Sequence, residues 1–151
     1  MWLNHYKCDI LSIKANDEYE CVEASHTGYK KVQHKRKIEF NKVEESFTIT
    51  DYLLVTDNKE HSILLHLHLH PEIDILETSK FNYKLSDNQK VKLRIECDNQ
   101  LETKIIKGLD NPVLGWYSSS FMQKCPTNVI QGKQKINSNT TLITKIYIDE
   151  Y

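Results

Sequence analysis

The chain has 151 residues, a length that suits one domain with a core large enough to need no disulfide or metal support. Its 20 Lys and Arg residues against 21 Asp and Glu residues give a net charge of -1, which offers no basic field for gripping a nucleic-acid backbone. No apolar run approaches the roughly 18 to 20 residues of a membrane span, and the first residues lack the charged-then-apolar layout of a signal peptide. We therefore expect no nucleic-acid partner, no membrane span and no export signal in this chain.

Segments that alternate between apolar and polar residues, and that are rich in Ile, Val, Leu, Thr, Tyr and Phe, follow one another along the chain. The predicted strands are residues 8–14, 19–24, 32–40, 46–54, 62–70, 91–96, 102–107 and 140–148. No stretch offers three turns of amphipathic helix. The pattern predicts an all-β fold, an antiparallel β-sandwich with little or no helix, formed by residues 1–151 as a single domain.

A first polar cluster consists of His26 and Tyr29, which lie between the second and third predicted strands, and His34 and Arg36, which lie on the third. A Tyr and His pair near an Arg is what proton abstraction beside a carboxylate needs, because the Arg neutralises the acid while the others move protons. A simpler interpretation is structural: His34 and Arg36 alternate along one strand face, where a partly buried Arg can pair with an acid such as Asp51. We favour the structural interpretation.

The next candidate is a row of histidines, His66, His68 and His70, which alternates with leucines at 65, 67 and 69. Alternate residues on a strand stand about 7 Å apart, so two imidazoles can reach one metal if a further ligand comes from a neighbouring strand. Further ligands could be Asp51, His34 or Glu72. A polar outward face explains the same pattern, and the sequence does not show the three or four converging donors that zinc demands. We therefore predict no metal or other cofactor and keep the row as a weak metal candidate.

Trp116 and Tyr117 lie next to each other beside small polar residues. Two aromatic rings in such a setting can form a platform that packs against the apolar face of a pyranose. They can equally cover the end of the sandwich, since Trp and Tyr often have one apolar and one wet end. Both interpretations stay open at this point.

Five short segments occur in the following order: residues 24–29 (ASHTGY), 34–38 (HKRKI), 49–53 (ITDYL), 66–71 (HLHLHP) and 115–118 (GWYS), with Pro126-Thr127 after them. In this order and spacing, roughly residues 20–130 resemble the C-terminal β-rich region of heparinase II/III-like proteins, which are polysaccharide lyases and relatives encoded in bacterial polysaccharide loci. The resemblance implies a helical toroid ahead of β-sandwich layers in the intact protein. It also implies β-elimination on uronic-acid glycans, in which a Tyr or His base removes the C5 proton while Asn, Arg or His groups, or a metal in some members, stabilise the carboxylate.

The same resemblance implies that the catalytic Asn and Tyr come from the toroid, and the catalytic His from a His-rich segment at the start of the sheet region. Nothing upstream of Ala24 matches that segment, so we assign no catalytic residue to this chain. We predict the non-catalytic C-terminal β-sandwich of a larger toroid-plus-sandwich lyase, inactive when isolated, with a structural role and a place along the glycan groove. The candidate glycan contacts are His34, Arg36, Trp116 and Tyr117.

The expected partners are an acidic polysaccharide, through the parent enzyme, the toroid domain, and further copies of the chain through exposed strand edges. The resemblance implies a periplasmic or cell-envelope location. Two alternatives stay open: a stand-alone carbohydrate-binding sandwich that uses Trp116 and Tyr117, and a small metal-dependent enzyme that uses the histidine row.

Overall fold

The computed structural model describes residues 6–87 and 90–148, and within these ranges every regular element is a strand. The strand pairs are antiparallel, so the predicted all-β antiparallel sandwich class is confirmed. In the part of the chain that the structure describes, no helix is long and apolar enough to cross a membrane. The chain folds into two compact units, unit 1 and unit 2.

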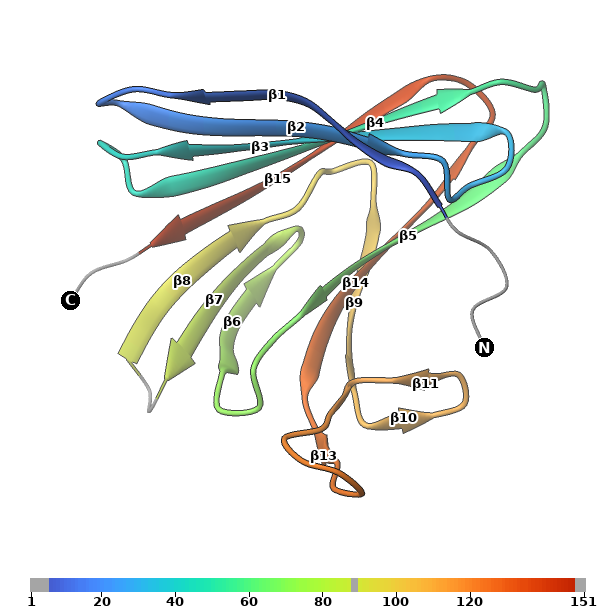
Figure 1. The fold of residues 1–151 in the computed structure, drawn as a ribbon. Helices are drawn as coiled ribbons and strands as arrows, with labels where there is room; N and C mark the ends of the chain where they lie inside the picture. The colour runs from blue at the N-terminus through green and yellow to red at the C-terminus, as the bar shows by residue number, and fades with distance from the viewer. Residues whose placement is uncertain (1–5, 88–89, 149–151) are drawn as a thin grey trace. The chain divides into compact units, whose positions relative to one another are not determined.

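Unit 1 comprises Met1–His61 and Lys135–Tyr147. Its strands are β1 (Cys8–Ala15), β2 (Tyr19–His26), β3 (Val32–Asn41), β4 (Ser46–Val55) and β15 (Thr140–Ile148). They lie side by side in this order, with β1 at the edge of the sheet (Figure 1). Asn residues form two of the turns. In the turn between β1 and β2, the Asn16 side chain accepts hydrogen bonds from two backbone amides that follow it, and Asn41 does the same in the turn between β3 and β4.

The two faces of the unit 1 sheet differ in chemistry. One face bears ion pairs such as Lys35 with Glu23, at 2.7 Å, and the Lys35 ammonium lies 4.5 Å from the centre of the Tyr52 ring. The opposite face, called here the network face, carries apolar side chains such as Phe40 and Phe47, whose rings stack with centroids 4.5 Å apart. Strand register places His26, His34, Arg36 and Asp51 on this same face. Polar groups on an otherwise apolar face need partners among themselves.

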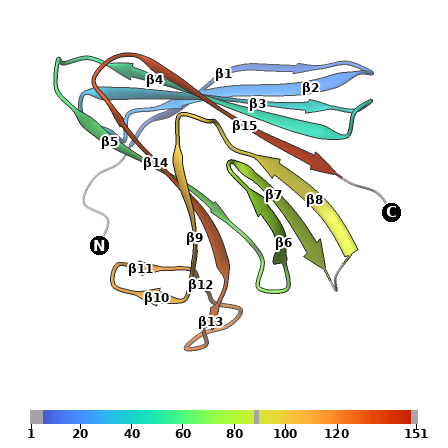
Figure 2. The same ribbon diagram turned by 180° about the vertical axis from the view of Figure 1, so that it is seen from behind.

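Unit 2 comprises Ser62–Gln134 and Ile148–Tyr151. One group of its strands is β6 (Asp74–Ser79), β7 (Asn82–Asp87) and β8 (Lys90–Glu96), and a second is β5 (His61–His68), β14 (Asn128–Ile136) and β9 (Glu102–Lys107). Two small hairpins add β10 (Leu109–Asp110) with β11 (Val113–Leu114), and β12 (Trp116–Tyr117) with β13 (Cys125–Pro126). Figure 2 shows β14 between β5 and β9, and β7 between β6 and β8.

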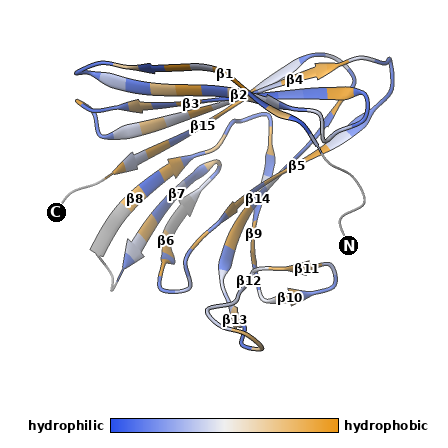
Figure 3. Cartoon of the chain, in the orientation of Figure 1, coloured by the Kyte–Doolittle hydropathy of each residue, from blue (hydrophilic) through white to orange (hydrophobic). Residues whose placement is uncertain are grey.

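The core of unit 2 is apolar and closely packed. Leu85 and Val129 are fully buried, and Leu101 and Ile130 are nearly so. Each contributes about 1.5–3 kcal/mol by leaving water. Hydrophobic and hydrophilic segments alternate along the strands in place of one long apolar run (Figure 3).

All eight predicted strands form, with ends within two residues of the expected ones. The strand predicted over residues 62–70 ends at His68, so His70 lies beyond it, and the amide of Ile73 turns back to the carbonyl of His70 at 2.9 Å. Pro71 explains the early end, because proline cannot donate to a ladder. The prediction missed β6, β7 and β14, whose polar residues and Gly132 interrupt the alternation that marks a strand.

The four cysteines are all free. Cys21 and Cys97 are buried, as expected of small apolar side chains, and Cys8 is exposed. Burial raises the pKa of the Cys97 thiol to about 11, and the charge of Asp98 adds to that effect. Cys97 is therefore an inert core residue at neutral pH.

Candidate functional site

Four polar side chains from three neighbouring strands meet on the network face of unit 1. His26 ends β2, His34 and Arg36 alternate along β3, and Asp51 lies in the middle of β4. The antiparallel register puts His26 opposite His34, and Arg36 opposite Asp51. Directly opposite residues have Cβ atoms about 4.5–5.5 Å apart, so the register alone brings these groups within reach of one another.

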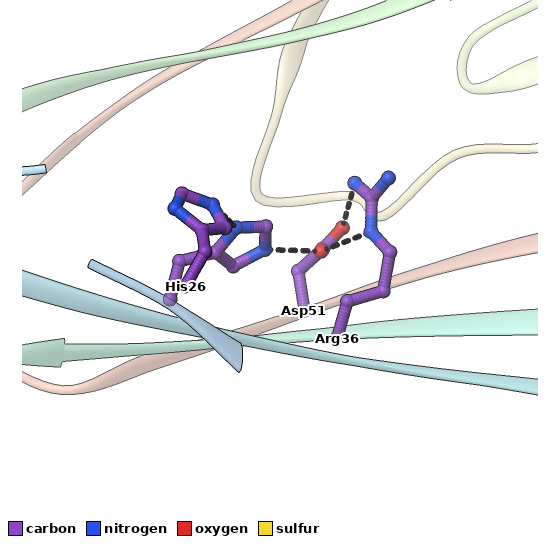
Figure 4. A network of polar contacts seen from close by, with 4 residues as sticks. His26, Arg36 and Asp51 are labelled. Atoms are coloured by element: carbon purple, nitrogen blue, oxygen red, sulfur yellow. Dashed lines mark hydrogen bonds and ion pairs between the residues drawn. The ribbon is translucent and has the colours of Figure 1, made fainter. Parts of the chain in front are cut away.

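Asp51 is the centre of this network (Figure 4). Its Oδ1 atom accepts hydrogen bonds from His34 Nε2 and from Arg36 Nε, each at 2.6 Å. Its Oδ2 atom accepts a second bond from Arg36, through Nη2 at 2.9 Å. The Arg36 fork is therefore bidentate, which is the strong and directional form of this ion pair.

Hydrogen bonding also fixes the protonation of the two histidines. The backbone amide of Gly28 donates to His26 Nδ1 at 3.0 Å, so that nitrogen carries a lone pair and the proton of a neutral ring is on Nε2. His26 Nε2 then donates to His34 Nδ1 at 3.0 Å, and His34 donates from Nε2 to Asp51. The chain of bonds runs in one direction from Gly28 to Asp51 with both imidazoles as Nε2–H tautomers.

Burial and charge support this assignment. Burial lowers the pKa of His26, and the nearby charges of His34 and Arg36 lower it further, so the neutral ring that can accept from Gly28 is favoured. Burial by itself would raise the pKa of Asp51, but the hydrogen bonds from His34 and Arg36 outweigh it and hold that pKa below its usual range. The side chain of Asp51 is 6% exposed, against 14% for His34 and 40% for Arg36. Arg36 is thus the member of the ion pair that solvent reaches.

Tyr29 completes the cluster from the turn between β2 and β3. Its ring lies edge-on to His26 with centroids 5.0 Å apart, and 6.1 Å from His34. The residue is 59% exposed. The hydrogen bond to Asp51 raises the pKa of Arg36 against the opposing effect of burial, and the charge of Asp51 and then Tyr29 adds to the rise. Tyr29 and Arg36 therefore form the accessible side of the cluster.

The histidine row in unit 2 is built differently. His66 and His68 are neighbours on β5, with ring centroids 5.9 Å apart, but His66 Nε2 contacts the amide nitrogen of Gln131 on β14 at 2.7 Å. Burial, and then the charge of His68, lowers the pKa of His66. His70 lies edge-on to the Tyr117 ring, with centroids 5.2 Å apart. The three imidazoles thus have separate surroundings.

The aromatic pair of unit 2 lies on the short strand β12. The Trp116 indole donates from Nε1 to the carbonyl of Leu109 at 3.0 Å, and the Lys124 ammonium lies 3.8 Å from the centre of the Trp116 ring. Gly115 begins this arrangement with a φ of 78°, and its carbonyl accepts from the amides of Gly108 and Thr127. A Cβ at this position would lie 2.8 Å from Gly108 N, so only glycine fits.

The predicted contact residues therefore fall into two groups, His34 and Arg36 in unit 1 and Trp116 and Tyr117 in unit 2. Sequence reasoning identified the pairing of Arg36 with Asp51 but did not include His26 or Tyr29 among the contact residues. Cross-strand register is the signal that finds His26, since it sits opposite His34. Within residues 6–87 and 90–148, no group of three or more His, Cys, Asp or Glu side chains converges as a metal would require.

Comparison with known proteins gives one family. The sequence model described as heparinase II/III-like, C-terminal, matches residues 2–144. The crystal structure of the heparan sulfate lyase HepC from Pedobacter heparinus superposes with a TM-score of 0.78 at 11% identity, covering 96% of this chain and 22% of that one. A heparinase III gene product with methylated lysines gives a TM-score of 0.77 at 15% identity, covering 96% and 22%. No curated protein matches the sequence. At these identities the likeness shows a shared fold, and the chain spans about a fifth of the length of either structure.

Proposed function

The chain belongs to the heparinase II/III-like C-terminal family, and on that premise we propose that it is the non-catalytic β-sandwich of a polysaccharide lyase that acts on uronic-acid glycans. In this role it supports a catalytic helical toroid domain and contributes contacts along the glycan groove. The observation that carries the proposal is the network face of unit 1. There, a buried carboxylate holds an Arg whose outer side is open to solvent.

The bonding of the network supports a positioning role over a catalytic one. A general base needs a lone pair aimed at the proton that it removes. Both ring nitrogens of His34 are engaged, one by His26 and one by Asp51. Asp51 itself is buried and accepts three hydrogen bonds. These bonds leave His34 and Asp51 placed to orient Arg36, which supports the proposal that neither of them is the base that removes a C5 proton.

Charge and exposure support the glycan contacts. The Arg36 guanidinium is always charged, and it can meet a uronate carboxylate with Nη1, the nitrogen that is not bonded to Asp51. In this arrangement His34 acts through Asp51 and does not touch the sugar. In unit 2, Tyr117 is 37% exposed and offers a ring to a pyranose, while Lys124 over Trp116 offers a cation to an acidic sugar.

An activity assay tests the non-catalytic part. The isolated chain is incubated with heparan, alginate and related glycans, and the unsaturated product of β-elimination is followed by absorbance at roughly 230 nm. We expect no turnover. A steady rise in absorbance that Asp51→Asn abolishes would show that the network is a catalytic site and would overturn the proposal.

A binding assay tests the contact part. Heparan and alginate fragments are titrated into the chain at low salt by calorimetry, with tryptophan fluorescence as a second signal. Arg36→Lys keeps the charge but loses the planar fork and with it the bidentate bond to Asp51, and Tyr117→Leu loses the ring, so each should weaken binding. Lys14→Gln on the exposed edge strand is the charge control and should bind as the parent does. Equal affinity of the parent and the three variants would show that Arg36 and Tyr117 do not contact the glycan.

We also propose that the exposed edge of β1 supports self-association. The register of β1 shifts between Ile10 and Ser12, so Ile10 and Ile13 face the same side, opposite Ala24 and Val22. They are 66% and 70% exposed. An apolar edge strand is a template for pairing with a second strand. Sedimentation velocity should show an oligomer that Ile13→Lys converts to monomer, and a monomeric parent at high concentration would refute this.

A further inference from the structure

The side chain of His26 ties the turn between β2 and β3 to the network by hydrogen bonds. Gly28 donates to His26 Nδ1, and His26 Nε2 reaches His34. Tyr29 follows Gly28 directly and packs its ring on His26. The position of this exposed tyrosine therefore depends on the state of a half-buried imidazole.

We propose that His26 is the positioning residue of an acidic-sugar subsite formed by Tyr29 and Arg36. As a neutral ring it joins the Gly28–Tyr29 turn to His34, and through His34 to Asp51 and Arg36. The subsite rests on the glycan-contact function proposed above. Tyr29 supplies a ring for the face of a pyranose, and Arg36 supplies the cation for the carboxylate at its rim.

The space around Gly28 supports this role. A Cβ built on Gly28 would lie 2.9 Å from His26 Nδ1, closer than side chains pack. The imidazole cannot move aside freely, because its other nitrogen is bonded to His34. Glycine at position 28 thus lets the backbone amide approach the His26 ring closely enough for the hydrogen bond. A larger residue would hinder that bond even if it could adopt the turn.

Protonation of His26 would break this arrangement. A proton on Nδ1 turns the acceptor of the Gly28 amide into a second donor, so the two N–H groups face each other. The turn then loses its hydrogen bond to His26, although the Thr27 amide still donates to the Lys7 carbonyl, and the Tyr29 ring loses the fixed imidazole on which it packs. The titratable and charged groups around His26 are Cys8 on β1, Tyr29 in the turn, His34 and Arg36 on β3, and Asp51 on β4, with Tyr6 beside Gly28.

The proposal predicts a pH dependence with an unusual sign. Simple charge attraction makes an acidic glycan bind more tightly as histidines gain protons. Here acidification should weaken binding, because the proton on His26 releases Tyr29. We expect a loss of about fivefold, the factor that corresponds to one lost hydrogen-bonded contact.

Two variants of His26 separate the two bonds. His26→Asn keeps an acceptor near the position of Nδ1 for the Gly28 amide but cannot reach His34, whereas His26→Gln reaches His34 but leaves the amide without its acceptor. Both should remove the pH dependence of binding and lower affinity at neutral pH, as should Gly28→Ala. Tyr29→Leu should have low affinity at every pH. Tyr19→Leu, which changes another partly exposed tyrosine of unit 1, and His61→Asn, which changes a histidine bonded to Asp57, are the controls.

NMR of the full chain, with nitrogen-15 labels for the imidazoles and amides and carbon-13 labels for the tyrosine rings, supplies a readout that does not depend on glycan. At neutral pH, His26 and His34 should both be Nε2–H tautomers, and the Gly28 amide and the Tyr29 ring should shift together as His26 titrates. An Nδ1–H tautomer of His26, or a Gly28 amide that ignores its titration, would overturn the inference whatever the glycan result. Absence of glycan binding by the parent at every pH, with the NMR result as expected, would instead overturn the proposed function and the subsite that rests on it.

Discussion

Histidines gather in two regions of this molecule, and the two regions use them in opposite ways. In unit 1, His26 and His34 come from neighbouring strands and join into one line of hydrogen bonds that ends on a buried carboxylate. In unit 2, the row at 66, 68 and 70 comes from one short segment, and each ring finds a different environment. The same residue type thus gives a connected network in one place and separate contacts in the other.

Strand geometry explains the difference. Residues opposite each other on adjacent strands are closer than alternate residues on one strand, which stand about 7 Å apart. The imidazoles of His26 and His34 therefore bond directly at 3.0 Å. A His-x-His run is easy to notice in a sequence. In this chain, however, the shared site is formed by His26 and His34, which are eight positions apart and pair across two strands.

The largest expected effect is the removal of the charge that holds the network together. Asp51→Asn leaves an amide N–H or a weaker acceptor where His34 and Arg36 both donate, and it leaves Arg36 without its counter-charge. We expect a loss of about 2–3 kcal/mol of unfolding free energy, below the value for a fully buried pair because Arg36 is partly exposed. The urea midpoint followed by far-ultraviolet circular dichroism measures it.

Asp57→Asn is the matched control for that loss. Asp57 also bonds a histidine, His61, at 2.7 Å, but its side chain is 22% exposed against 6% for Asp51, and no arginine bond to it is found among the described residues. It should shift the midpoint much less. Equal shifts for the two variants would mean that the network adds nothing beyond one ordinary surface pair.

The network should make the stability of the parent protein depend on pH, with a loss of stability in acid. The pKa of His26 is lower in the folded chain than its ordinary value of 6.5, so the unfolded chain binds a proton first. The contribution of His26 to the free energy of unfolding is therefore fully present above pH 6.5, and it is lost as the pH falls below that value. Asp51, with a pKa below its ordinary 3.8, adds a second loss as the pH falls past that value.

Urea midpoints from about pH 7.5 to about pH 5 test the first window, in which we expect a smaller loss than that of Asp51→Asn. His26→Asn, which cannot titrate in this range, should show a flatter profile. A flat profile for the parent, or the same slope for both proteins, would contradict the assignment of a neutral His26 in the network.

The strands were predictable because alternation is local. Residues such as those of β3 and β4 show period-two patterning strongly enough to fix both the strands and their faces. Strand β14 was missed because its burial depends on neighbours: Val129 and Ile130 are both buried although they are adjacent, which no alternation can indicate. A strand covered on both faces does not look like a half-buried one.

The site was predictable only in part, for the same reason. The bond between Arg36 and Asp51 follows from a partly buried arginine that can pair with an acid. The link from His26 to His34 follows from register, which requires knowing that the turn between β2 and β3 pairs these two residues. Lys124 over Trp116 depends on the small β12–β13 hairpin, and its two-residue strands are too short to leave a pattern.

A smaller effect on the free energy of unfolding is expected at His66, which is bonded to a buried partner, Gln131. His66→Leu keeps the volume on β5 but removes the ring nitrogen that meets the Gln131 amide. Gln131 is itself buried, so its side chain would lose a partner away from water, at a cost of about 1 kcal/mol. A double change with Gln131→Leu should recover most of the loss, and failure to recover would show that His66 stabilises unit 2 in another way.

The smallest effect should come from His68, which is exposed and shares only a ring contact with His66. His68→Gln should change the unfolding free energy by less than about 0.5 kcal/mol. Zinc sharpens the test, because a metal present at about a hundred times its dissociation constant would stabilise a real site by about 2.7 kcal/mol. Since His66 Nε2 is bonded to Gln131 and no third ligand joins the row within the described residues, the urea midpoint should be the same with zinc as with a chelator. A zinc-dependent rise that His68→Gln removes would show that the row does converge, and the contrast between the two histidine regions would then fail.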